Sequence, residues 1–210
     1  MTPELLQLEA PTRDVQCGLS PAPCSASFGC VYADPPWEYP EGFPTQTTVN
    51  GEWQPVEIKP LPYPSMTVAE ICALPVKQLA AKDCRLFLWT TNRYLRAAFD
   101  VLDAWGFEYR QTLTWHKLDG NTGGSIAPNS TEFLMVAVKG KPACKQRLKT
   151  SVVGMAHQRH SQKPKEFYYL IERTTEGPYV ELFARRKRPG WQSWGNEVAC
   201  DVAMTPNNRI

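Results

Sequence analysis

The sequence predicts an α/β protein with a mostly parallel sheet flanked by helices. Short apolar runs of strand type alternate with segments of helical periodicity, which is the pattern of parallel strands joined by helices. Hydrophobic residues make up 42% and charged residues 21% of the 210 residues, so the composition is globular and excludes a disordered or coiled-coil protein. No repeat or linker divides the chain, and we expect one domain over residues 1–210.

The first third of the chain is rich in proline and is predicted to be largely irregular. Twelve of the nineteen prolines lie in residues 1–64, and we expect an irregular segment over 1–28. An apolar run at Gly29–Asp34 is typical of a buried strand. Residues 38–64 then carry six prolines and no periodicity, which predicts an active-site loop.

Regular elements are predicted after Pro64. Helical spacing of apolar residues begins after a capping residue at Ser65 or Thr67, and it recurs from Asn92 or Tyr94 to Trp105 and over Lys165–Thr175. A second active-site loop, polar and containing glycine, is expected over 117–131. Strands are predicted at Arg85–Trp89, Tyr109–His116, Phe133–Val138, Ser151–Met155 and Tyr179–Ala184.

Charge and cysteine content restrict the environment and the partners. Residues 1–110 hold 8 Lys and Arg against 13 Asp and Glu, whereas residues 111–210 hold 15 against 8. A basic half is typical of proteins that meet a polyanion, and equally of a solvated surface. The seven cysteines show no C-x-x-C spacing, which suits a reducing compartment and argues against a zinc site. Neither a membrane span nor a signal peptide is visible, so we expect a cytoplasmic protein that is not secreted.

The sequence Asp34-Pro35-Pro36-Trp37 follows the first predicted strand, and ligands of open α/β sheets bind at the carboxyl ends of strands. The two prolines fix the backbone, so the Asp34 carboxylate and the Pro35 carbonyl stand side by side as acceptors. Such a pair suits a donor with two hydrogens, such as the amino group of a nucleobase, and Trp37 and Tyr39 offer surfaces on which a base can stack. The alternative is a structural turn with a surface tryptophan.

From about Cys30 to Glu197 the chain resembles the DPPW-type adenine-N6 methyltransferases, which include the eukaryotic mRNA adenosine enzyme and bacterial and phage DNA enzymes. The resemblance extends beyond the tetrapeptide at Asp34–Trp37. Further ordered matches are Leu61-Pro-Tyr-Pro-Ser-Met66, Leu86-Phe-Leu-Trp-Thr-Thr-Asn92, His160-Ser-Gln-Lys-Pro-Lys-Glu166, Glu181-Leu-Phe-Ala-Arg185 and Gly190-Trp191…Trp194-Gly-Asn-Glu197.

The resemblance implies a Rossmann-like class I methyltransferase fold in permuted form, with the catalytic strand before the cofactor-binding segment. It implies S-adenosylmethionine as the methyl donor and an adenine amino group as the acceptor. A permuted order fits the absence of a G-x-G-x-x-G sequence after any predicted strand. The residues that it assigns to catalysis are Asp34, Pro35, Pro36 and Trp37, and those that it assigns to the cofactor are Asp34, Lys163, Phe183, Arg185, Asn196 and Glu197. The sequence departs from the family at Arg186-Lys187, and Lys187 is a further cofactor candidate whose alternative role is a phosphate contact.

A nucleic-acid substrate is the expected partner, and no metal is expected because the histidines lack ligand spacing. Five cations between Lys139 and Lys149 predict phosphate contacts, which give salt-dependent affinity without sequence information. The target base must leave any duplex to reach a recessed site. The predicted substrate-binding residues are Tyr39, Tyr63, Glu132, Lys145, Arg147, Lys149, His157, Arg159 and His160.

Three functions remain open at this point. The sequence favours a bacterial or phage DNA enzyme, because no accessory nucleic-acid module or basic tail is recognisable in it. An RNA adenosine methyltransferase is the alternative. An inactive binding subunit is the third, although Asp34, Lys163 and Asn196 are all retained. A homo-oligomer or a helper subunit would supply further nucleic-acid contacts.

Overall fold

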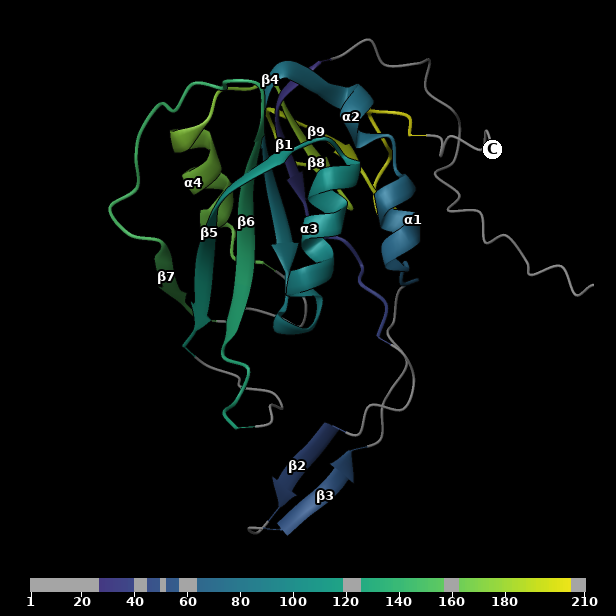
Figure 1. Ribbon diagram of the computed structural model, residues 1–210, viewed down its shortest axis with the longest axis vertical. Coiled ribbons are helices and arrows are strands. Elements are labelled where there is room, and N and C mark those ends of the chain that lie inside the picture. Colours follow the sequence, from purple (N-terminus) through teal and green to yellow (C-terminus); the bar gives the residue numbers. More distant parts are fainter. Residues whose placement is uncertain are drawn as a thin grey trace, which may run out of the picture.

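The computed structural model describes residues 27–39, 64–118, 126–156 and 163–204, together with the backbone of two strands at 45–49 and 52–56. Its centre is one seven-stranded sheet with helices on both faces (Figure 1). In spatial order the strands are β7 (Val152–Met155), β5 (Glu108–Lys117), β6 (Thr131–Lys139), β4 (Ala80–Thr90), β1 (Phe28–Ala33), β8 (Tyr179–Leu182) and β9 (Trp191–Trp194).

Only β6 runs against the other strands of this sheet. It is antiparallel to both β4 and β5, whereas β1 is parallel to β4 and to β8. The outer pairs β5–β7 and β8–β9 are parallel as well. The predicted mostly parallel sheet is therefore confirmed, with a single reversed strand near one edge.

The helices lie in two layers that cover opposite faces of the sheet (Figure 1). One layer holds α1 (Val68–Ala73), α2 (Val76–Leu79) and α3 (Leu95–Ala104), and the other holds α4 (Glu166–Thr174). A 3₁₀ turn, η1 (Asn92–Tyr94), leads into α3. Of the two predicted capping residues, Thr67 caps α1, and it forms a capping box: Thr67 accepts from the backbone of Glu70, whose carboxylate accepts from the Thr67 N–H.

Two hydrophobic cores result from the alternation of side chains along the central strands. Val31 and Ala33 of β1 pack toward α1 and α3, whereas Cys30 and Tyr32 pack toward Phe167 of α4. The side chains of β1 are buried on both faces, as expected for a central parallel strand. This double burial fixes the position of the residues that follow β1.

Several predicted boundaries differ from the structure. The first strand begins at Phe28, inside the segment 1–28 that was predicted to be irregular, and β4 begins five residues before the predicted Arg85. Segment 38–64 was predicted to lack regular structure, but it contains an antiparallel pair, β2 (Thr45–Val49) and β3 (Glu52–Val56). The sequence of β2 (TQTTV) is polar and rich in threonine, and that of β3 (EWQPV) contains a proline, so neither is typical of a strand. Strand β9 was also missed, because its flanking Gly190 and Gly195 resemble turn residues.

Candidate active site

The candidate site lies at one edge of the sheet, where several chain segments meet. Strands β1, β4, β5 and β8 are parallel, so their carboxyl ends share this edge. Because β6 is antiparallel, its first residues lie at the same edge. Residues separated by more than a hundred positions in the sequence are therefore brought together, as in other open α/β sheets.

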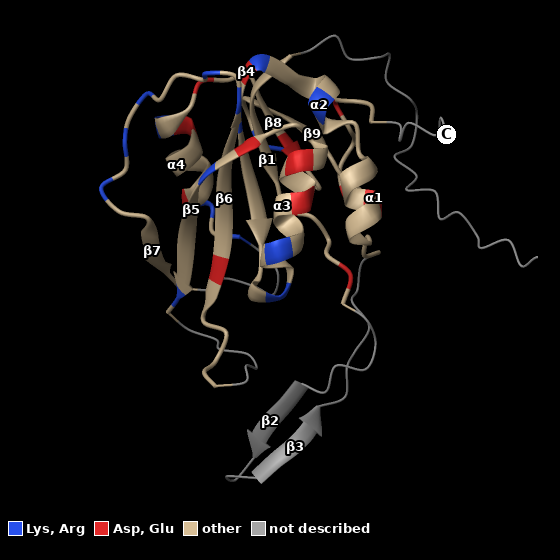
Figure 2. Cartoon of the chain, viewed as in Figure 1, with Lys and Arg blue, Asp and Glu red and all other residues tan. Residues whose placement is uncertain are grey.

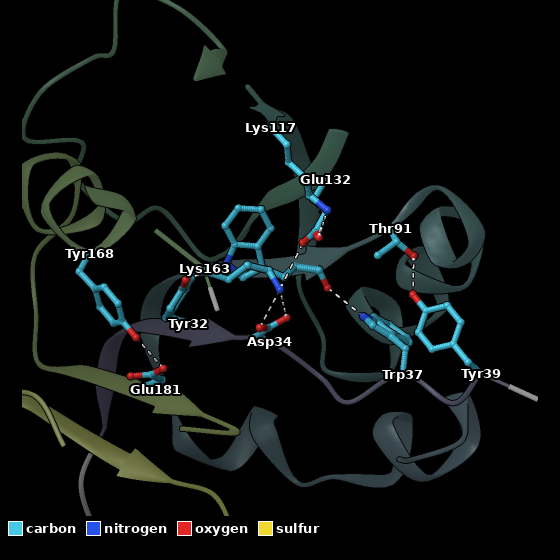
Figure 3. A network of polar contacts seen from close by, with 11 residues as sticks. Tyr32, Asp34, Trp37, Tyr39, Thr91, Lys117, Glu132, Lys163, Tyr168 and Glu181 are labelled. Atoms are coloured by element: carbon cyan, nitrogen blue, oxygen red, sulfur yellow. Dashed lines mark hydrogen bonds and ion pairs between the residues drawn. The ribbon is translucent and has the colours of Figure 1, made fainter. Parts of the chain in front are cut away.

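Asp34, directly after β1, forms an ion pair with Lys163, which precedes α4 (Figure 3). The Lys163 ammonium nitrogen donates to both carboxylate oxygens, with Nζ 2.8 Å from each. The same nitrogen lies 5.2 Å from the centre of the Trp89 ring, which is buried at the end of β4. The side chains of Lys163 and Asp34 are 14% and 26% exposed, so the pair is largely screened from water but still reachable.

Glu132 and Lys117 extend this pair into a row of alternating charges. Glu132, near the start of β6, places Oε2 3.3 Å from the Lys163 nitrogen and Oε1 2.6 Å from the Lys117 nitrogen. Lys117, the last residue of β5, also lies 5.4 Å from the centre of the Trp115 ring. The row Asp34, Lys163, Glu132, Lys117 is electrically neutral and has both a carboxylate and an ammonium available to a zwitterionic ligand.

The pKa values in this row are set by burial and by the opposing charges. For Asp34, burial raises the pKa above its usual value and outweighs the lowering by Lys163. For Lys163, burial lowers the pKa, but Asp34 and Glu132 together hold it above its usual value. For Glu132, burial raises the pKa, yet Lys163 and Lys117 outweigh it and the net shift is downward. Glu132 and Lys163 are therefore held firmly in their charged forms.

The turn after β1 is held to the segment before α1 by backbone hydrogen bonds. The Pro36 carbonyl accepts from the Met66 N–H at 2.8 Å, and the Glu38 N–H donates to the Met66 carbonyl at 3.1 Å. The Pro35 carbonyl accepts from the Trp37 N–H at 2.9 Å. A carbonyl oxygen has two lone pairs, so the Pro35 oxygen keeps one for a further donor.

Trp37 does not offer the exposed stacking surface that was predicted from the sequence. Its side chain is 5% exposed, it stacks on Tyr94 with ring centres 5.0 Å apart, and its indole N–H donates to the Trp89 carbonyl at 3.2 Å. That prediction is wrong because the indole completes the core between the end of β1 and η1. Tyr39, two residues further on, stays 45% exposed and is the aromatic ring of this turn that a base could reach.

The predicted cofactor segment begins where β8 ends. Phe183 has a φ of 64°, an uncommon left-handed conformation for a residue with a side chain, and such outliers concentrate at functional sites. Gly195 lies against Ala184 so closely that an added Cβ would fall 2.2 Å from the Ala184 carbonyl oxygen. This contact holds the exposed pair Asn196 and Glu197 beside the end of β8.

Ion pairs connect the other cofactor candidates to this segment. Arg185 lies 3.7 Å from a Glu197 oxygen, so two of the predicted residues are brought together. Lys187 is paired with Asp201, on the segment after β9. The cofactor roles of these residues stay predictions, since the positions alone do not test them.

A third partly buried carboxylate, that of Glu181, was not assigned to the site from the sequence. Glu181 of β8 accepts a hydrogen bond from the Tyr168 hydroxyl of α4 at 2.8 Å (Figure 3). Burial, the dominant effect, and the nearby charge of Asp34 raise the pKa of Glu181 to about 7, against a lowering by Tyr168 and Arg188. An acidic residue inside the predicted strand Tyr179–Ala184 was the available signal. Lys117 had a similar signal, since it directly follows the predicted strand end at His116.

The predicted phosphate contacts lie away from Asp34. Lys145 donates to the Glu172 carbonyl at 3.1 Å, in the last turn of α4, whereas Lys163 precedes the first turn of that helix. Arg147 and Lys149 are exposed and line a cavity of about 280 Å³ with Leu170 of α4. Figure 2 shows the cations of this region along the connection between β6 and β7. The predicted substrate residues outside the described ranges are Tyr63, His157, Arg159 and His160.

The described residues provide neither a metal-binding cluster nor a membrane-spanning helix. None of their His, Cys, Asp and Glu side chains form a group of three or more that could hold a metal ion. None of the helices that the structure describes is long and apolar enough to cross a membrane.

A mostly parallel sheet with one reversed strand, and with a charged carboxyl edge, defines a Rossmann-like fold of the methyltransferase type. Residues 28–197 match the model of the MT-A70 family, and the chain belongs to this family. The predicted family and fold class are thereby confirmed, and the family assignment supports N6-adenine methyltransferase activity.

Three relatives differ in the share of their own length that this chain matches. The Type II methyltransferase M.MunI of a Mycoplasma species is 31% identical over 197 residues, covering 87% of this chain and 80% of that protein. The N(6)-adenosine-methyltransferase catalytic subunit METTL3 of Homo sapiens is 31% identical over 183 residues, covering 81% and 28%. The N(6)-adenine-specific methyltransferase METTL4 of Mus musculus is 29% identical over 209 residues, covering 88% and 40%. The chain thus spans less than half the length of these last two relatives.

Proposed function

We propose that this chain transfers the methyl group of S-adenosylmethionine to the exocyclic amino group of adenine in DNA, giving 6-methyladenine. The observation that carries the proposal is the acceptor pair after β1. The Asp34 carboxylate is fixed by Lys163, and the Pro35 carbonyl beside it keeps a free lone pair. These two acceptors match the two hydrogens of an adenine amino group.

The residues at the carboxyl edge fit S-adenosylmethionine. Its methionine part carries a carboxylate and an ammonium, for which Lys163 and Asp34 offer the opposite charges. Its ribose hydroxyls suit the amide and carboxylate oxygens of Asn196 and Glu197, which the close packing of Gly195 holds at the end of β8. The left-handed turn at Phe183 and the glycine contact together stand where a glycine-rich loop is found in other Rossmann-like folds.

In the reaction, the chain's own groups orient the nucleophile. Bound S-adenosylmethionine supplies a methyl group on a positively charged sulfur, which leaves as a neutral thioether. Asp34 and the Pro35 carbonyl accept the two N6 hydrogens, which aims the nitrogen lone pair away from them. The N6–carbon bond forms as the carbon–sulfur bond breaks, and one N6 proton then leaves. Because that proton becomes acidic only after the transfer, fixed acceptors suffice and a strong base is unnecessary.

DNA is proposed over RNA on the extent of the matches. The match with M.MunI covers 197 residues and that with the N(6)-adenine-specific methyltransferase METTL4 covers 209, whereas the relatives named as N(6)-adenosine-methyltransferases match over 182 or 183. RNA is the second candidate, because the identity to METTL3 is also 31%. The excess of Lys and Arg in residues 111–210 supports either polyanion.

The deciding experiment compares matched oligonucleotides. S-adenosylmethionine labelled in its methyl group is incubated with DNA and RNA of one sequence, each single- and double-stranded, and the labelled base is identified after hydrolysis. We expect label in 6-methyladenine from DNA. If the label appeared only in RNA, the proposed substrate would be wrong and the proposed reaction would be retained. No transfer to any of the four oligonucleotides, with S-adenosylmethionine bound, would refute the proposed function.

The Asp34 variant tests the acceptor pair. Asp34→Ala is expected to lower the single-turnover rate at least about 100-fold, the effect typical of removing one fixed polar group from a transition state. Binding of S-adenosylhomocysteine, measured by calorimetry, should be weakened but retained, since Asn196 and Glu197 remain. Asp100→Asn, an exposed carboxylate on α3, serves as the matched control. An Asp34→Ala rate within threefold of the wild-type rate would contradict the assigned role.

A further inference from the structure

The exposed ring of Tyr39 has an unusually well-fixed position for a surface aromatic side chain. Its hydroxyl lies 3.2 Å from the Thr91 hydroxyl, directly after the end of β4. Its ring meets the Tyr94 ring edge-on, with centres 5.5 Å apart, and the Arg93 guanidinium lies 5.9 Å from its centre. With 45% of the residue exposed, one part of the ring is available to a ligand while the rest is held.

The Trp37 side chain separates the Tyr39 ring from the acceptor pair, which is Asp34 and the Pro35 carbonyl. Figure 3 shows Trp37 between Asp34 and the Tyr39–Thr91 contact. Trp37 is itself inaccessible, because Tyr94 covers one face and its indole N–H is engaged with the Trp89 carbonyl. A base whose amino group reaches Asp34 therefore finds no exposed ring at Trp37, and among the described residues of this turn the exposed ring is that of Tyr39.

We propose that Tyr39 and Arg93 form a subsite for the nucleotide next to the target adenine, with its base stacked on the Tyr39 ring and its phosphate beside Arg93. This inference rests on the proposed function, since it needs a polynucleotide whose target base occupies the Asp34 site. A nucleotide joined to the target must lie just outside the turn, and Tyr39 follows Asp34 by only five residues. Stacking on an aromatic ring tolerates any base and so suits a position that is not read by hydrogen bonds.

The Tyr39 hydroxyl is partly desolvated and lies within range of the row of alternating charges. Burial is the largest effect and raises the pKa of this hydroxyl, and the charges of Glu132 and Lys163 also act on it. Arg93 also lies 5.8 Å from the centre of the Tyr94 ring, which places its guanidinium over two rings of the turn. A guanidinium in that position pairs with phosphate while it contacts the aromatic faces.

The test measures binding of single-stranded oligonucleotides with one adenine, with S-adenosylhomocysteine present, by fluorescence anisotropy. One oligonucleotide is intact, and others carry an abasic residue on the 5′ side of the adenine, on its 3′ side, or in place of it. Loss of one stacked base is expected to weaken wild-type binding about 5- to 150-fold at one of the two neighbouring positions. Tyr39→Ala should weaken binding of the intact oligonucleotide by a similar factor and be insensitive to that abasic residue.

Matched variants separate stacking from other causes. Tyr39→Phe keeps the ring but loses the Thr91 contact, and should bind within about threefold of wild type. Arg93→Gln should lower the dependence of log Kd on log salt by about one unit. Tyr169→Ala is the control, because Tyr169 is 52% exposed and has Arg188 5.0 Å from its ring, yet lies on α4. Retained binding of S-adenosylhomocysteine reports that each variant is folded.

Several outcomes overturn the subsite. One is that Tyr39→Ala and wild type bind the intact oligonucleotide equally. Another is that removing either neighbouring base weakens binding by Tyr39→Ala as much as it weakens binding by wild type. If an abasic residue at the target position does not weaken binding by Tyr39→Ala, the Tyr39 ring contacts the target base instead. If Tyr39→Ala fails to fold, Tyr39→Leu takes its place with the same expectations. A wild-type chain that binds the oligonucleotides but transfers no methyl group contradicts the proposed function and leaves this binding test intact.

Discussion

Two carboxylates at the same edge of the sheet are held in opposite ways. Asp34 follows β1 and faces the Lys163 ammonium, whereas Glu181 lies on the neighbouring strand β8 and faces the Tyr168 hydroxyl (Figure 3). Burial raises the pKa of both groups. At Asp34 a cation opposes that shift, but at Glu181 the phenol and a more distant guanidinium oppose it less, and its pKa reaches about 7.

Burial is the largest effect on the pKa of both carboxylates, but their partners differ, because the Lys163 ammonium contacts Asp34 directly and favours its charged form. Near neutral pH a carboxylate with a pKa of about 7 is divided between its two protonation states. Asp34 is stabilised as an anion by a direct ammonium contact, and so keeps its lone pairs for hydrogen-bond donors. A substrate amino group is therefore expected at Asp34, and proton exchange with the medium at Glu181.

Removing the cation gives the largest expected effect. Lys163→Met leaves Asp34 and Glu132 partly buried without their shared partner, and we expect the free energy of unfolding to fall by about 3–5 kcal/mol. The pKa of Asp34 should rise further, toward the behaviour of Glu181. Chemical denaturation at pH 7.5 measures the loss, and S-adenosylhomocysteine binding should weaken with it.

The control for this variant is close in the sequence. Lys165→Met removes an exposed cation two residues further on and should change stability by less than about 0.5 kcal/mol. Adding Asp34→Asn to Lys163→Met should recover part of the loss, because it removes one of the unpaired charges. A double variant that is less stable by the full sum of the single effects would show that the two groups are not coupled.

Glu181→Gln is expected to have a smaller effect that depends on pH. The folded state raises the pKa of Glu181 from 4.5 to about 7, so between these pH values the folded chain holds a proton that the unfolded chain has released. The free energy of unfolding therefore falls as pH rises through this window, by at most about 3 kcal/mol. Glutamine cannot ionise, so Glu181→Gln should be more stable than wild type at pH 8 and nearly equal to it at pH 4.5.

Denaturation curves at several pH values test this sign. Glu108→Gln, an exposed carboxylate at the start of β5, should show a difference from wild type that stays within about 0.5 kcal/mol at every pH. If the stability of Glu181→Gln relative to wild type falls as pH rises, the inferred difference between Asp34 and Glu181 is wrong.

Much of the fold was predictable because its strands are buried on both faces. Continuous apolar runs such as those at Gly29–Asp34 and Arg85–Trp89 mark central strands, and the helices over α3 and α4 have clear apolar faces. Strands β2 and β3 could not be predicted in this way, because neither contains a continuous apolar run and β3 contains a proline. The same holds for β9, which is short and bounded by glycines.

The sequence predicts the site residues that directly follow one strand. It does not predict which residues from the ends of different strands come into contact. Asp34 and its prolines follow one strand directly, and Glu132 and Lys163 came from the family resemblance. That Lys117 touches Glu132 depends on the pairing of β5 with β6, and that Glu181 lies near Asp34 depends on the pairing of β8 with β1. Such pairings join distant segments, and no local pattern reports them.

Replacing Lys117 is expected to have the smallest effect on stability and a specific effect on the pH dependence of catalysis. Lys117→Met removes one of the two cations that lower the pKa of Glu132, and Lys163 still pairs with that carboxylate. We expect a stability loss of about 1 kcal/mol. The pKa of Glu132 should rise, and since an uncharged Glu132 no longer restrains Lys163, the acid limb of the kcat/KM profile should move to higher pH.

Lys139→Met is the matched comparison for this last variant. Lys139 is the last residue of β6, at the opposite end of that strand from Glu132, and its ammonium donates to the carbonyls of Lys77 and Ala80. Its loss should cost a similar free energy of unfolding without moving the acid limb. If both variants shift the limb equally, or neither does, Lys117 contributes only stability, and the row of alternating charges ends at Glu132.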